Sequence, residues 1–89
     1  MDDVLRDAKV LITNGDKEGL QIYYADLIET YDTTTIDFPY LFRHLYVHAC
    51  LKKKHEIVIW LKNLYDEMDP ITKIALRQIF AYGEYLLRN

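Results

Sequence analysis

The stretch DFPYLFRHLYVHACLKKKHEIVIWLKNLY, residues 37–65, decides the fold class. Apolar residues recur every three or four positions on both sides of a lysine triplet, which is the spacing of one face of an α-helix. Asp37 before Phe38-Pro39 is typical of a helix start, because the carboxylate caps free backbone N–H groups and proline needs no N–H in the first turn. The stretch therefore predicts two helices joined by a turn at Lys52-Lys53-Lys54.

No glycine or proline stands in the triplet to enforce this turn. Repulsion between neighbouring lysines and the loss of the apolar stripe favour a break there. One long helix is the alternative. A short strand over Glu56–Leu61 is a second alternative, because Ile57-Val58-Ile59-Trp60 has strong β-propensity.

The same spacing extends outward in both directions. An apolar stripe from Val4 to Ile12 ends at Asn14-Gly15, and a second follows Asp16 as far as Tyr31. Residues 32–37 include three threonines and form a connector. Asp69-Pro70 starts a last helix that runs to about Leu87. We therefore expect an all-α domain of about five helices in antiparallel hairpins.

The last predicted helix, residues 70–87, carries apolar residues on two flanks. A helix of this kind is expected to be widely buried. The residues concerned are Ile71, Ile74, Ala75, Ile79, Tyr82 and Leu86 on one flank and Leu76, Phe80 and Leu87 on the other.

Length and composition agree with one small domain over residues 1–89. Apolar residues make up 51% and charged residues 28%, which is too apolar for a disordered tail and too charged for a membrane span. Cys50 is the only cysteine, so no intramolecular disulfide forms. The N-terminal sequence lacks the pattern of a signal peptide, and we expect a cytoplasmic or nuclear location with no membrane contact.

Charge is distributed unevenly along the chain. Residues 1–37 hold three basic and nine acidic side chains, whereas the formal net charge of the whole chain is −3, so the remainder is mildly basic. This balance argues against nucleic-acid binding through overall charge. It favours a charged protein partner or head-to-tail association between copies of the chain.

The candidate chemical groups do not form an active site in the sequence. His44 and His48 share one helix face and could reach one metal ion, but two ligands do not make a site. Cys50 lacks the signature of a catalytic thiol and is expected to be a buried, inert side chain. No phosphate-binding loop or nucleophile elbow is present, so we predict no enzyme activity, no cofactor and no metal site.

Eight tyrosines are too many for the core of so small a domain. Tyrosine serves equally in a core and at a protein interface, and the lysine triplet could contact an acidic partner. The residues expected to bind a partner are Tyr24, Tyr40, Tyr46, Lys52, Lys53, Lys54, Tyr82 and Tyr85.

An internal similarity appears where Gly15-Asp16-Lys17-Glu18 is aligned with Lys53-Lys54-His55-Glu56. Residues 49–61, ACLKKKHEIVIWL, resemble the inter-helix segment of ankyrin repeats, and Trp60 before Leu61 resembles the divergent ankyrin-like repeats of large DNA viruses. Lys53-Lys54 replaces the Gly-His of that family, and its Thr-Pro-Leu-His signature is absent. An irregular small bundle is the alternative.

The resemblance implies a small protein–protein interaction module, such as a viral or accessory host-interaction protein, that binds another protein or a second copy of itself. The alternative function is a small helix-turn-helix DNA-binding regulator that places Lys52–Lys54 on phosphates. A metal-dependent enzyme built on His44 and His48 is a third hypothesis.

Overall fold

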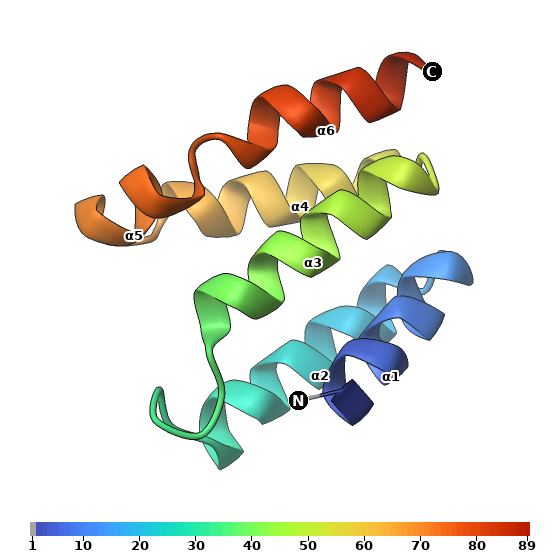
Figure 1. The fold of residues 1–89 in the computed structure, drawn as a ribbon. Coiled ribbons are helices and arrows are strands. Elements are labelled where there is room, and N and C mark those ends of the chain that lie inside the picture. The colour runs from blue at the N-terminus through green and yellow to red at the C-terminus, as the bar shows by residue number, and fades with distance from the viewer. Residues whose placement is uncertain (1) are drawn as a thin grey trace.

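The computed structural model describes residues 2–89, which form six α-helices and no strand (Figure 1). The chain is therefore all-α, as the sequence predicts, with one helix more than expected. The helices are α1 (Asp2–Thr13), α2 (Lys17–Thr30), α3 (Phe38–Leu51), α4 (His55–Asp66), α5 (Pro70–Leu76) and α6 (Ile79–Arg88).

Three helices begin at an aspartate whose side chain accepts a backbone N–H of the first turn. Asp37 accepts from Tyr40 N at 3.1 Å, and Asp69 accepts from Thr72 N at 3.0 Å. Both caps confirm the predicted starts of α3 and α5. Asp16 caps α2 in the same way, through Gly19 N at 2.9 Å.

The lysine triplet is a turn between α3 and α4, so the alternatives of one long helix and of a strand over residues 56–61 are wrong. Lys53 takes a left-handed backbone conformation with φ 57°. This conformation lets the N–H groups of Lys53 and Lys54 bond back to carbonyls of α3, and the helix ends without a glycine.

The turn between α1 and α2 has the same form as this lysine turn. Gly15 has φ 70° and takes the place that Lys53 has after α3, since each is the second residue beyond its helix end, Thr13 or Leu51. The matching bonds are Gly15 N to Ile12 O (2.9 Å), Asp16 N to Leu11 O (2.9 Å), Lys53 N to Cys50 O (3.1 Å) and Lys54 N to Ala49 O (3.0 Å). The internal similarity of the sequence thus corresponds to a repeated turn geometry.

Helix α3 lies at the centre, with α1 packed on one side and α6 on the other (Figure 1). Helices α2 and α4 pair with α1 and α3 as hairpin partners. They meet each other where the Tyr24 ring stands edge-on to Trp60, with centroids 5.8 Å apart. Trp60 is half-buried at this contact, and its neighbour Leu61 is fully buried.

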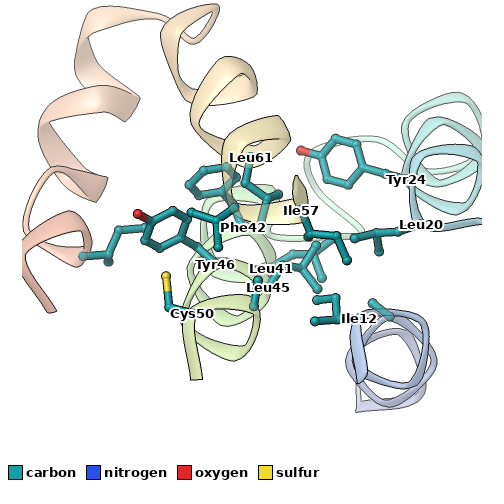
Figure 2. Packing of buried hydrophobic residues seen from close by; sticks show 14 of the residues in the cluster. Ile12, Leu20, Tyr24, Leu41, Phe42, Leu45, Tyr46, Cys50, Ile57 and Leu61 are labelled. Carbon is teal, nitrogen blue, oxygen red and sulfur yellow. The ribbon is translucent and has the colours of Figure 1, made fainter. Parts of the chain in front are cut away.

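The core is built around one face of α3 (Figure 2). Among residues 2–89 every buried side chain is apolar or a tyrosine or cysteine, and no charged side chain is buried. The contribution of α3 is Leu41, Phe42, Leu45, Tyr46, Ala49 and Cys50. Cys50 is therefore a buried thiol, as predicted, and burial raises its pKa, which opposes reactivity at neutral pH.

The last predicted helix, residues 70–87, is divided at Arg77-Gln78 into α5 and α6. Each part is held by a different anchor. Tyr65 of α4 donates its hydroxyl to the carbonyl oxygen of Lys73 at 2.9 Å, whereas α6 packs along α3. Helix α5 also contacts α3, but the Tyr65 bond ties it to α4 as well, and the chain bends between α5 and α6.

The expectation that both flanks of this segment are buried is wrong in part. Leu76 and Ile79 are buried, but Ile71, Ile74, Ala75 and Tyr82 are exposed. The bundle is too thin to cover a helix that already packs one face on α3. An apolar surface therefore remains on the outside of the last two helices.

Candidate protein-interaction surface

The exposed apolar side chains of α5 and α6 form the candidate site, which we term the α5–α6 surface. Its members, with their exposed fractions, are Ile71 (80%), Ile74 (66%), Tyr82 (53%) and Tyr85 (62%). The buried Leu76 and Ile79 hold the two helices against the core from the opposite side. Exposed apolar residues also occur on other helices, but Ile71 and Ile74 are the most exposed of the large apolar side chains in the described chain, and the next helix carries an exposed tyrosine pair. This combination favours an interaction surface.

Tyr82 and Tyr85 stand side by side on α6. Their ring centroids are 6.4 Å apart and the ring planes differ by 14°, so the rings are nearly parallel. A tyrosine offers a large contact area with few rotatable bonds, so little conformational entropy is lost when a partner covers it. This pair suits the centre of a protein contact.

Helix α6, which carries these tyrosines, is held closely against the rest of the molecule. Gly83 faces α3 so closely that a Cβ atom at this position would lie 2.5 Å from Tyr46 Cε2 and 2.9 Å from Cys50 Sγ. At the end of α6, the Lys53 ammonium donates to the carbonyl oxygens of Leu86 and Leu87, each at 3.2 Å. The last carbonyl groups of a helix have no partner within the helix, and a cation there is favourable.

Lys53 is expected from the sequence to bind a partner, but the structure places its ammonium on this intramolecular contact instead. Lys52 is exposed and Lys54 is half-buried near Gly15. Of the triplet, Lys52 is thus the residue with the freest side chain. The two other lysines have structural contacts that the sequence spacing does not reveal.

Two of the five tyrosines expected to bind a partner are buried. Tyr46 is fully buried and Tyr24 is 8% exposed, so neither can lie on a binding face (Figure 2). Both lie at positions where a neighbouring helix covers α3 or α2. Tyr40 is exposed on α3, with its ring 4.4 Å from the His44 ring. Tyr82 and Tyr85 are the candidates that the structure brings together.

A groove between α1 and α3 has a volume of about 550 Å³. His48 lies at its edge, and its Nε2 is 3.0 Å from the Thr13 hydroxyl. Burial, together with Lys9, lowers the pKa of both His44 and His48. Within residues 2–89 no three histidine, cysteine or carboxylate side chains gather closely enough to hold a metal ion.

The chain matches no protein-family model, no curated protein and no solved structure. Among the described helices, none has the length and apolar character needed to cross a membrane. The α5–α6 surface therefore has to be interpreted from its own chemistry.

The sequence does indicate this exposed surface, although the prediction that both apolar flanks of residues 70–87 are buried overlooks it. Ile71, Ile74, Tyr82 and Tyr85 continue one stripe through Gln78, whereas Leu76, Ile79 and Gly83 continue another. Only one of two such stripes can face a single neighbouring helix. The second stripe is the indication of an exposed apolar face.

Proposed function

We propose that this chain is a small protein–protein interaction module that binds a partner protein through the α5–α6 surface. The observation that carries the proposal is the exposure of Ile71, Ile74, Tyr82 and Tyr85 on helices that are firmly anchored on their other side. An apolar, aromatic patch on a rigid support is typical of the centre of a protein interface.

The architecture that accompanies this proposal is a stack of helix pairs related to ankyrin-like repeats, as in a viral or accessory host-interaction protein. It is supported by the two equal turns at Gly15 and Lys53 and by the side-by-side first helices α1 and α3. An irregular bundle with one repeated turn is the competing description.

DNA binding through α3 and α4 is the less favoured function. The candidate recognition helix α4 carries Lys62 and His55 but also Glu56 and Asp66. Lys53 is in addition engaged with the end of α6. A helix with this charge balance has little electrostatic attraction for phosphates.

The proposal is tested by pull-down from the native host with the intact protein and two variants. Ile74→Glu places a charge in the α5–α6 surface, and Ile59→Glu places the same charge on the exposed face of α4, where Ile59 is 59% exposed. We expect a partner retained by the wild type and by Ile59→Glu to be lost from Ile74→Glu, with both variants showing wild-type helical content by circular dichroism. Equal retention by Ile74→Glu would contradict the proposal.

A further inference from the structure

The outward face of α2 is apolar at its centre and acidic around it. Ile22 is 64% exposed and has the exposed Ala25 one turn further on. At about 100° per residue these two lie opposite the buried side of α2, which Leu20, Tyr24 and Leu27 form. The exposed carboxylates around them belong to Glu18, Asp26 and Glu29. None of the ion pairs formed within residues 2–89 uses these carboxylates.

The α5–α6 surface has the opposite charge around a similar apolar centre. Residues 70–89 contain three basic side chains and one acidic side chain, Glu84. The basic residues are Lys73, Arg77 and Arg88, of which only Arg88 forms an ion pair in the described chain, with Glu84. The cations without an ion pair, Lys73 and Arg77, thus lie next to Ile74 along the chain, and the half-buried Lys73 places its ammonium 5.8 Å from the centre of the Tyr65 ring. The cation of α6, Arg88, is neutralised by Glu84.

These two faces lie on opposite sides of the molecule, because α3 separates the α1–α2 hairpin from α5 and α6 (Figure 1). They cannot meet within one chain. In a pair of copies, the α2 face of one copy can contact the α5–α6 surface of the other. The first copy then keeps a free α5–α6 surface, and the second keeps a free α2 face.

We infer that the partner of the α5–α6 surface is the acidic α2 face of a second copy of this chain, so that copies associate head to tail. The inference rests on the proposed function, since it takes the α5–α6 surface as a protein-binding one. Ile22 of one copy would pack near Ile74 and Tyr85 of the next, with the carboxylates of α2 opposite Lys73 and Arg77.

Charge complementarity selects this pairing over the symmetric ones. Two α2 faces in contact would oppose Glu18, Asp26 and Glu29 with themselves, and two α5–α6 surfaces would oppose their own cations. Like charges placed face to face suppress wrong pairings, whereas opposite charges favour association and fix its orientation. A contact between two different faces does not close on itself after two copies, so a ring or a chain of copies follows.

The contact is small, which sets the range of concentrations in which to look for it. Stable interfaces bury about 800 Å² on each partner, and one α-helix of 14 residues is only about 21 Å long. We therefore expect weak association, with an average mass that rises over about 10 μM to 1 mM rather than a fixed dimer.

The test uses two variants that each block one face. Ile22→Arg opposes the cations of the α5–α6 surface, and Ile74→Glu opposes the carboxylates of α2. In sedimentation or light scattering we expect each variant alone to be monomeric and an equimolar mixture to associate, because a mixed pair joins an unaltered α2 face to an unaltered α5–α6 surface. Ile59→Arg on α4 is the matched control and should associate like the wild type.

Three results would overturn the inference. The first is a wild type that stays monomeric up to about 1 mM, the upper end of the expected range. The second is an Ile22→Arg variant that associates like the wild type, and the third is a mixture that stays monomeric. The second result would point to a symmetric contact between α5–α6 surfaces. Loss of self-association together with a host protein that still requires Ile74 would leave the proposed function intact, so the two failures are distinguishable.

Discussion

Gly83 of α6 lies directly against the Tyr46 ring of α3, where a single added carbon atom would be 2.5 Å from Cε2. A larger residue at this position would keep the two helix backbones from coming this close. This contact, more than any local preference for helix, positions the end of the chain that carries the tyrosine pair.

Gly83→Ala is expected to lower the free energy of unfolding. Alanine is favoured over glycine in a helix by about 1 kcal/mol, but overpacking a core costs roughly 1–3 kcal/mol. The side chains that would have to shift, Tyr46 and Cys50, are both fully buried. We expect a net loss, measured by urea unfolding, while Glu84→Ala on the exposed side of α6 has little effect. A Gly83→Ala protein more stable than the wild type would show that α6 is not tightly packed.

Removal of the hydroxyl group is expected to change the free energy of unfolding differently at Tyr46 and at Tyr65. The Tyr46 hydroxyl is buried beside the Cys50 thiol, which is at most a weak hydrogen-bond partner, whereas Tyr65 bonds to the Lys73 carbonyl. Tyr46→Phe should therefore leave the free energy of unfolding unchanged or raise it, and Tyr65→Phe should lower it by about 1 kcal/mol, both measured by urea unfolding. Equal losses for the two variants would contradict this assignment.

Lys53→Met is expected to loosen the last turn of α6 without unfolding the protein. Methionine keeps much of the length of the side chain but removes the ammonium that binds the carbonyl oxygens of Leu86 and Leu87. Hydrogen exchange at the C-terminal amides of α6 should accelerate in Lys53→Met and remain at the wild-type rate in Lys52→Met. The same rates in both variants would show that the contact does not stabilise α6.

Mild acidification is expected to lower the stability of the protein because of the two histidines of α3. Burial and the neighbouring Lys9 hold the pKa values of His44 and His48 below their ordinary value of 6.5. Arg43 acts in the same direction on His44, and Lys52 does so on His48. Because the folded state disfavours their protonation, stability is present above pH 6.5 and is lost as the pH falls below it.

This effect can be measured by thermal melts between pH 7 and pH 5. The Asp69 carboxyl group stays ionised in this window, since its pKa lies below 3.8. We expect the midpoint temperature to fall across this window. The decrease should be smaller in the double variant His44→Gln/His48→Gln. An unchanged decrease in that variant would assign it to other groups.

The candidate site could be predicted from the sequence only in part. The excess of tyrosine indicates that some tyrosines are exposed, and Tyr40, Tyr82 and Tyr85 are. The sequence does not distinguish them from Tyr24 and Tyr46, because a tyrosine at helical spacing is compatible with either environment. Which of them faces water depends on the helix that packs next to it.

The sequence by itself determined the helical class and most helix boundaries. The caps at Asp37 and Asp69 and the stop at Gly15 depend on residues within about one helical turn, so they can be recognised in the chain. Only the tertiary structure decided the bend at Arg77-Gln78, the burial of Tyr46 and the contact of Lys53 with α6. These features join segments far apart in the sequence or depend on two anchors on different helices, and no local pattern encodes such a contact.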